Sequence, residues 1–241
     1  MLLKSKISQH QLSLDPLLNE DYYKARLGKF TSSEWHCLMS DRESTRLNYI
    51  YRKVGERLSG RPARDNISVA ATEHGLDYER EGLVKFGEKM GIVGLVKTQP
   101  LILDIDGMCG STPDGVWITN DSEDGLYHNV RTIEVKCPYS FDGYIRAWKC
   151  KTPQDLKKEK SDWYWQVLHQ MQICDCLDGY FVCYQPFFSK GGINVIPFNK
   201  LDITKNTTTK DKMNDFKLLN TRKEQAIKIF NETLKELTNV L

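Results

Sequence analysis

The stretch TPDGVWITNDSEDGLYHNVRTIEVKCP, residues 112–138, decides the architecture that this chain is expected to adopt. It contains two short β-rich runs, Val116 to Ile118 and Val130 to Val135, separated by a loop rich in Asn, Asp and Gly. Such loops favour turns, and apolar runs on both sides of a turn predict an antiparallel hairpin. Pairing of the two arms would bring Asp114, in a Pro-Asp-Gly turn, beside Glu134 in the second arm.

Glu134 and Lys136 flank Val135, and residues two apart in a strand share a face, so both side chains are expected to point the same way. Two carboxylates and an ammonium on one sheet edge suit phosphodiester hydrolysis. Carboxylates hold one or two Mg²⁺ ions, which stabilise charge on the phosphate and lower the pKa of a bound water. The lysine can orient or deprotonate that water, or stabilise the developing charge. The alternative is a surface hairpin with an ordinary Glu–Lys pair.

The pattern TPDG…IEVKCP resembles the SPDG…ELKCP signature of the phage lambda exonuclease family, also called YqaJ-like viral recombinases, within the PD-(D/E)xK nuclease superfamily. The resemblance extends from about Tyr22 to Pro186. It implies an α/β (α+β) fold with a PD-(D/E)xK restriction-endonuclease-like core, a central mixed β-sheet flanked by helices. It also implies that Asp114 and Glu134 bind metal with the backbone carbonyl of Val135.

The same resemblance implies that Lys136 activates the attacking water and that a glutamate on a preceding helix completes the acidic site. The block HGLDYE, residues 74–79, is similar to the family's GxxYE or GxxxE block and places Glu79 at that position. The alternative is an exposed helical glutamate that pairs locally with Arg80 or Lys85.

A further acidic residue precedes Asp114 by ten positions, as one does in the lambda enzyme. This residue is Asp104, which we hold as a supporting metal ligand. Asp106 is its rival, and either residue can simply end a strand.

Three residues match the positions that receive the substrate's 5′-phosphate in the family. Arg26 and Ser33 lie in RLGKFTSS, similar to the family's RLGxxTAS segment, and Thr112 replaces the serine of SPDG. A guanidinium binds phosphate in a bidentate manner, and a helix N-terminus offers free N–H groups. The alternative is an exposed arginine and a serine, Ser32 or Ser33, that only caps a helix.

Gln166 and Gln170 are four residues apart, so they lie on one helical face. The family carries glutamines in a comparable QVQ-type helix beside the nuclease site, where an amide binds phosphate or holds the attacking water. In the direct alignment Leu168 occupies the second glutamine position, so Gln166 is the first choice for this role. The alternative is a polar face on an amphipathic helix, and we expect His169 to lie on the helix surface.

The composition is that of an ordinary globular protein: 241 residues, 40% hydrophobic and 27% charged, with a net charge of +2. Any contact with DNA therefore needs a local basic surface. The seven cysteines, an odd count with no secretion signal, argue for reduced thiols, and their spacing, without a CxxC pair, speaks against an iron–sulfur cluster. No apolar run is long enough to span a bilayer, and no signal peptide is apparent, so we expect a cytoplasmic protein without membrane contact, in the host cytoplasm if phage-encoded.

We expect one nuclease domain over residues 1–241, with an N-terminal helical segment (about 1–90) and a C-terminal helix (about 210–241) that covers the sheet. Helical spacing predicts helices over residues 44–59, 69–89 and 140–148, and a hairpin over 180–198. The segment KCKTPQDLKKEKSD, residues 149–162, is expected to be a charged loop.

The resemblance implies an Mg²⁺-dependent deoxyribonuclease, with Mn²⁺ able to substitute, that digests one strand of duplex DNA from its 5′ end and leaves a 3′ single-stranded tail. It further implies a ring-shaped homotrimer that encloses DNA ends and acts with a phage single-strand annealing protein. The alternatives are a PD-(D/E)xK endonuclease or bacterial repair nuclease, and a catalytically dead DNA-binding or assembly protein on the same fold.

Overall fold

A computed structural model of the chain describes residues 7–8, 24–63, 70–92, 96–98, 102–104, 106–121, 126–188, 192–205 and 213–240. Its strands are β1 (Ile7–Ser8), β2 (Phe30–Thr31), β3 (Val96–Thr98), β4 (Ile102–Leu103), β5 (Cys109–Ser111), β6 (Gly115–Asp121), β7 (Leu126–Lys136), β8 (Asp178–Tyr184) and β9 (Ile193–Asn199). Its helices are the 3₁₀ helix η2 (Ser32–Cys37) and the α-helices α2 (Glu43–Ser59), α3 (Ala70–Met90), α4 (Phe141–Lys149), α5 (Pro153–Glu159), α6 (Ser161–Ile173), α7 (Lys200–Lys205) and α8 (Asp215–Thr238).

The main sheet is mixed and runs in the order β3-β6-β7-β8-β9, with β1 also paired to β7. Strands β6 and β7 form the predicted antiparallel hairpin, in which Val116 faces Thr132. Strands β7 and β8 are parallel, and α4, α5 and α6 form the crossover that a parallel pair requires. Strand β9 returns antiparallel to β8. The expected α/β fold with a central mixed sheet flanked by helices is confirmed.

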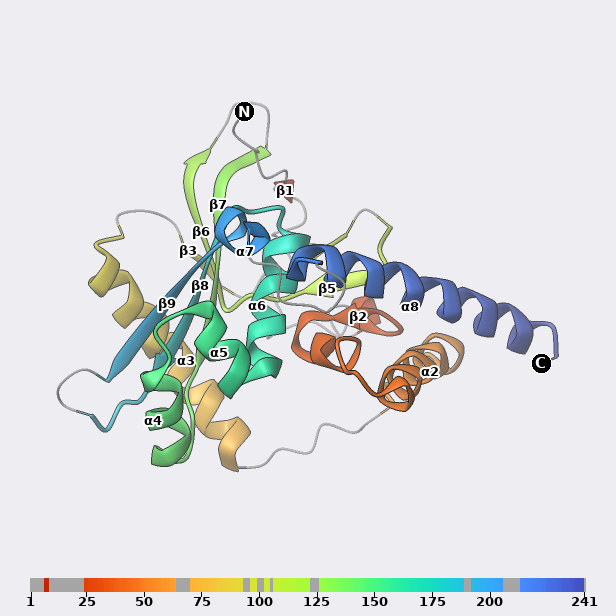
Figure 1. Cartoon of the computed structure of the whole chain (residues 1–241), viewed down its shortest axis with the longest axis horizontal. Coiled ribbons are helices and arrows are strands. Elements are labelled where there is room, and N and C mark those ends of the chain that lie inside the picture. The colour runs from red at the N-terminus through yellow and green to blue at the C-terminus, as the bar shows by residue number, and fades with distance from the viewer. Residues whose placement is uncertain are drawn as a thin grey trace.

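The side chains of β7 alternate between two layers of helices. Ile133, Val135 and Cys137 pack with Phe86 of α3 in one buried cluster. The intervening Glu134 faces the opposite layer, where it contacts α6. Figure 1 shows α3 behind the sheet and α6 in front of it. This alternation places the polar residues of β7 against a helix that itself carries polar side chains.

Helix α6 connects the main sheet with the N-terminal part of the fold, because it contacts β7 and β8 as well as η2 and β5. There a small sheet of order β2-β5-β4 carries Phe30, whose ring lies 5.7 Å from that of Tyr49 on α2 and 5.9 Å from that of Phe230 on α8. Helix α8 packs on α2, which lies beneath it in the view of Figure 1. It was expected to cover the sheet, but among the described elements it packs mainly on α2, α7 and α6, because its buried face meets this part of the fold, as in the contact of Phe230 with Phe30.

The helices predicted from hydrophobic spacing are confirmed within one or two residues at each end as α2, α3 and α4. Gly60 ends α2 in the left-handed conformation, with φ +64°, as a glycine at a helix end often does. The prediction of a helix N-cap at Ser32 or Ser33 is wrong, since the N-cap of η2 is Thr31.

The prediction that residues 149–162 form a loop is also wrong, because they include α5 and the start of α6. The hydroxyl of Thr152 accepts a hydrogen bond from the N–H of Asp155, and the Asp155 carboxylate accepts one from the N–H of Thr152. This reciprocal cap, with Pro153 at the first helical position, starts a helix that buries Leu156. Among the described residues, no helix combines the length and apolarity needed to cross a bilayer.

Candidate active site

The β6–β7 hairpin brings Asp114 to the end of β7 that carries Glu134. Asp114 immediately precedes β6, whose first residue, Gly115, faces Ile133. The Asp114 carboxylate accepts a hydrogen bond of 2.6 Å from the backbone N–H of Val135. This bond fixes the aspartate against the strand, and it confirms that the two predicted arms pair in the register that joins the two acidic positions.

Glu134 and Lys136 point to the same side of β7, as predicted from their spacing. The Nζ of Lys136 lies 2.5 Å from Oε1 of Glu134. The glutamate side chain is 1% exposed, whereas the lysine side chain is 24% exposed. The lysine therefore links a buried carboxylate to the solvent-accessible edge of the site, and a simple surface ion pair does not describe this geometry.

Helix α6 supplies two further donors to the same carboxylate. The side-chain amide of Gln166 donates to Oε1 of Glu134, and that of Gln170 donates to Oε2, each at 2.5 Å. Gln166 is 8% exposed and Gln170 is fully buried. The alternative, that both glutamines form a polar face of the helix exposed to solvent, is therefore wrong. Lys136, Gln166 and Gln170 thus all donate to Glu134, and the two glutamines lie one helical turn apart on α6.

Glu79 reaches the site from α3, which approaches the sheet closely at Gly82. A Cβ at Gly82 would lie 2.8 Å from Cγ1 of Val135 and 3.1 Å from Cβ of Tyr184, so only glycine permits this approach. Glu79 lies three residues earlier and therefore on the same helical face. Its strongest electrostatic neighbours are Lys136 and Glu134. The alternative of local pairing with Lys85 is not met, since Lys85 pairs with Glu88 at 2.9 Å.

The grouping of carboxylates shifts the pKa values of the site. Burial, with Glu134 nearby and against the opposing effect of Lys136, raises the pKa of Glu79 to about 7. Burial and the charges of Glu134 and Glu79 raise the pKa of Asp114 well above its usual range. Burial would lower the pKa of Lys136, but the three carboxylates outweigh it and raise that pKa. The site concentrates negative charge that one ammonium does not fully compensate.

The carboxylate oxygens of the site fit a hard divalent cation that takes its remaining ligands from water and substrate. Mg²⁺ in phosphoryl-transfer sites is commonly held by one or two carboxylates, with water and phosphate oxygens completing its shell. Among the described residues, no group of three His, Cys, Asp or Glu side chains has the geometry of a ready-made metal site. Asp114 and Glu134 can supply carboxylate oxygens, and the mutual repulsion that raises the pKa of Asp114 is what a bound cation would relieve.

Comparison with known proteins identifies the family. The YqaJ-like viral recombinase domain matches residues 21–177, which is more than half of the chain. The chain belongs to this family. No curated protein matches the chain. The motif resemblance that pointed to YqaJ-like recombinases and the lambda exonuclease kind is therefore confirmed.

Several solved structures share the fold of this chain. An alkaline exonuclease from Laribacter hongkongensis has a TM-score of 0.66 at 20% identity, over 92% of this chain and 97% of that chain. The same enzyme in complex with dAMP gives 0.67 at 21% identity, with the same coverage. A phage-related exonuclease from Haemophilus somnus 129PT gives 0.58 at 12% identity, over 87% and 96%. At these identities the likeness establishes the fold alone.

Of the residues that the YqaJ-like resemblance assigns to the 5′-phosphate, Ser33 and Thr112 lie on segments that adjoin elements of the site. Ser33 is exposed on η2, which packs against α6. Thr112 lies between β5 and β6, two residues before Asp114. Arg26 lies in the turn that leads into β2. Their contact with a phosphate stays a prediction.

Asp104 is held apart from the acidic group by partners of its own. Its carboxylate accepts a hydrogen bond of 2.9 Å from the N–H of Cys109 and pairs with Lys223 of α8 at 2.7 Å. None of the described contacts of Asp104 joins it to Asp114 or Glu134. Its role as a metal ligand stays a prediction that this geometry does not favour.

Sequence reasoning missed the buried pair that joins η2 to α6. The hydroxyl of Ser32 lies 2.7 Å from Nδ1 of His169, and the imidazole stacks on the Trp35 ring with centroids 3.6 Å apart. His169 was expected on the helix surface, but it is 1% exposed. Burial and the nearby Lys223 hold its pKa well below the usual range, so it is neutral. A signal was available in the sequence: apolar or aromatic residues occupy positions 164, 165, 167, 168 and 171 around His169, a pattern that leaves little of the helix polar and favours burial.

Proposed function

We propose that the protein is an Mg²⁺-dependent deoxyribonuclease that degrades one strand of duplex DNA from its 5′ end and leaves a 3′ single-stranded tail. The observation that carries the proposal is the meeting of Asp114, Glu134 and Lys136 at one end of β7. Membership of the YqaJ-like family and the fold of lambda-type alkaline exonucleases support a nuclease of this kind. Because Asp114, Glu134 and Lys136 are all present, a catalytically dead member of the family is not favoured.

Each residue of the site has a task that its contacts support. Asp114, held by the Val135 N–H, presents its second carboxylate oxygen to the site. Glu134 is kept in one orientation by Gln166 and Gln170. We propose that these two carboxylates, with the backbone carbonyl of Val135, hold Mg²⁺. When bound, the ion would polarise the phosphate and lower the pKa of a water molecule. Mn²⁺ is expected to substitute because it prefers the same ligands.

Lys136 is placed to orient water and to stabilise the charge that develops on the phosphate. Its raised pKa keeps the ammonium protonated while the carboxylates are ionised, so it acts first as a fixed positive charge. Loss of a proton from its Nζ becomes easier only when the charge of those carboxylates is compensated. Glu79, whose pKa lies at about 7, can exchange a proton at neutral pH.

Recognition of the 5′ end is proposed for Arg26, Ser33 and Thr112. The guanidinium can bind two phosphate oxygens at once, and the exposed Ser33 hydroxyl can donate to a third. Ser32 is hydrogen-bonded to His169, so Ser32→Ala serves as the control for Ser33→Ala. We expect Ser33→Ala and Arg26→Ala to lower the preference for 5′-phosphorylated over 5′-hydroxyl ends. Equal cutting of both ends by the native protein would remove this pocket from the account.

A ring-shaped homotrimer and a phage single-strand annealing protein as partner belong to the same proposal. A ring would retain DNA by enclosure, so a chain of net charge +2 could act processively. Sedimentation equilibrium of the purified protein tests this point, with a mass of three chains expected and a stable monomer contradicting it.

The experiment that tests the function compares linear duplex with covalently closed circles of the same sequence, in Mg²⁺ and in EDTA. An end-dependent exonuclease should degrade the linear DNA in Mg²⁺ and leave the circles intact. Cutting of the circles would favour the endonuclease alternative, and loss of neither substrate would favour a binding protein.

A further inference from the structure

Helix α4 exposes an apolar face beside the site. Phe141, Ile145 and Trp148 are spaced by four and three residues, so they lie on one face, and they are 55%, 43% and 44% exposed. The adjoining side of the helix, with Tyr144 and Ala147, is buried. Large apolar side chains gathered on one exposed face indicate a binding surface, whereas single scattered ones do not.

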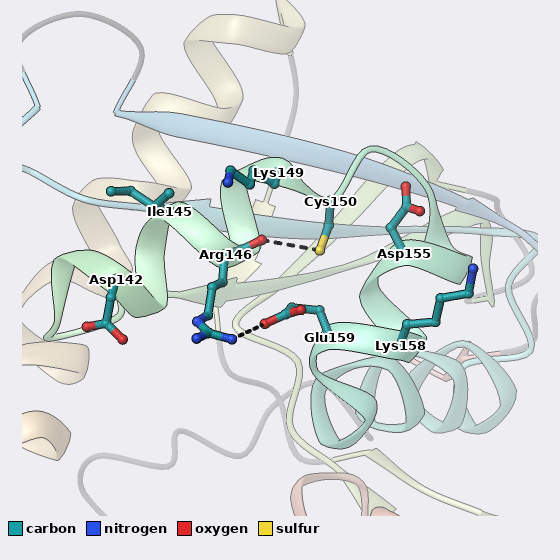
Figure 2. A pocket seen from close by; sticks show the side chains of 8 residues that line it. All are labelled: Asp142, Ile145, Arg146, Lys149, Cys150, Asp155, Lys158 and Glu159. Carbon is teal, nitrogen blue, oxygen red and sulfur yellow. Dashed lines mark hydrogen bonds and ion pairs between the residues drawn. The ribbon is translucent and has the colours of Figure 1, made fainter.

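Positive charge is concentrated around this face. Residues 139–160 contain six Lys and Arg residues and three Asp and Glu residues, a net charge of +3, whereas the whole chain has only +2. A cavity of about 630 Å³ between α4 and α5 is lined by both signs of charge, Arg146, Lys149 and Lys158 with Asp142, Asp155 and Glu159, and Arg146 points to Glu159 (Figure 2). The ammonium of Lys151 lies 4.0 Å from the centre of the Trp148 ring. An aromatic ring and a cation thus lie together at the end of α4, in a stretch whose net charge is positive.

This surface is continuous with the catalytic strand. Tyr139, which is 63% exposed, follows Lys136 by three residues at the end of β7. The Phe141 ring lies 5.6 Å from that of Phe188. Phe187, the neighbour of Phe188, contacts Tyr78, which adjoins Glu79. A strand that leaves the site along α4 would therefore pass from the carboxylates directly onto aromatic rings.

We propose that the α4 surface, formed by Tyr139, Phe141, Ile145, Trp148, Lys149 and Lys151, binds single-stranded DNA. Unpaired bases stack on its aromatic rings, and the lysines contact the phosphates. Single-stranded DNA fits better than duplex, because the bases of a duplex are already stacked and paired. The charge favours a polyanion over a neutral protein partner. This inference rests on the proposed function, since the strand left by a 5′→3′ exonuclease is the single-stranded DNA present at the site.

The test measures binding of a fluorescent oligothymidine and of a blunt duplex in EDTA, so that no cutting interferes. Trp148→Ala should weaken binding of the oligothymidine by about 5- to 100-fold, as expected for loss of one stacked base. It should change binding of the blunt duplex less than twofold. Lys149→Ala combined with Lys151→Ala should weaken binding and make it less dependent on salt, because two phosphate contacts are lost.

Matched controls are Leu201→Ala and Lys205→Ala, which alter an exposed apolar side chain and an exposed cation on α7. Both should bind the oligothymidine as the native protein does, and thermal melting should show that every variant is folded. The inference is overturned if Trp148→Ala and the double lysine variant bind it normally, or if affinity for duplex falls equally. A change in oligomeric state in Trp148→Ala would also overturn it, by making the surface a subunit contact. A native protein that binds the oligothymidine but never cuts DNA would refute the proposed function alone.

Discussion

At the scale of single residues, Glu134 is the most constrained group of the site. Its buried carboxylate accepts from Lys136, Gln166 and Gln170, so both oxygens have donors. Buried charges persist only when such partners compensate for lost hydration. Glu134 and Lys136 are therefore not an exposed ion pair: Glu134 is fixed inside the fold, and Lys136 reaches the edge of the site.

The first prediction concerns Lys136. Replacing it by Ala should leave DNA binding within about twofold but lower Mg²⁺-dependent cutting by about 10²–10⁴-fold, as for loss of a positioned catalytic group. Lys85→Ala, which removes an exposed lysine of α3, is the control and should cut normally. Undiminished cutting by Lys136→Ala would refute the role given to this lysine.

The second prediction concerns the pH dependence of stability. The pKa of Glu79 is about 7 in the folded protein against 4.5 for an ordinary glutamate. Between these values the folded state binds more protons, so the free energy of unfolding should fall as pH rises through this window. His169 acts in the opposite sense: its lowered pKa means that stability is lost as pH falls below its usual value of 6.5.

The contribution of Glu79 is therefore isolated by comparing the native protein with Glu79→Gln in EDTA. From about pH 5.5 to pH 8, the melting temperature of the native protein should decline more, or rise less, than that of the variant. Added Mg²⁺ should stabilise the native protein more at the higher pH, because ionised carboxylates bind the cation. Identical pH profiles of the two proteins would remove Glu79 from the acidic group.

At the scale of elements, α3 is positioned by the glycine at its contact with β7. Gly82→Ala should destabilise the protein by about 1–3 kcal/mol through overpacking and, by displacing Glu79, lower cutting about tenfold. Gly87→Ala is the matched control on the same helix, since a Cβ there meets nothing within 4 Å. It should stabilise the protein by about 0.5–1 kcal/mol and cut normally. Equal stability and activity of the two variants would contradict the close approach.

Helix α6 is the second positioning element. Gln170→Ala should destabilise the protein by about 1–3 kcal/mol, because it leaves a buried carboxylate oxygen without its amide donor, and should lower cutting. Gln172→Ala is the control: this amide lies on the same helix but donates to Asn220 of α8. If Gln170→Ala cuts and melts like the control, α6 does not hold Glu134 in the way described.

The elements also show what sequence could and could not predict. The β6–β7 hairpin was predictable because its turn residues and its apolar arms lie within one short stretch, and the bond from the Val135 N–H to Asp114, next to Glu134, follows from that local pairing. Helix α5 was predictable in principle from the Thr152–Asp155 cap and was missed, because its abundant charges resemble a loop. The amides on Glu134 and the Ser32–His169 pair join segments at least 32 residues apart, and periodicity carries no information on such contacts.

At the scale of the whole molecule, the acidic site and the positive α4 surface occupy adjoining regions of a nearly neutral chain. Residues outside 139–160 have a net charge of −1, so general attraction to DNA is weak. DNA must then be retained by local contacts and, in the proposed ring, by enclosure. Any mutation that disrupts assembly should therefore shorten the tract degraded per binding event more than it slows each cut.

The most direct test of the central claim uses linear duplex labelled on either the 5′ or the 3′ end, incubated with Mg²⁺ or with EDTA. With Mg²⁺ the 5′ label should be released early as mononucleotide while the 3′ label stays on long strands, and EDTA or Lys136→Ala should abolish release of the 5′ label. Early release of the 3′ label, or equal cutting in EDTA, would contradict the central claim.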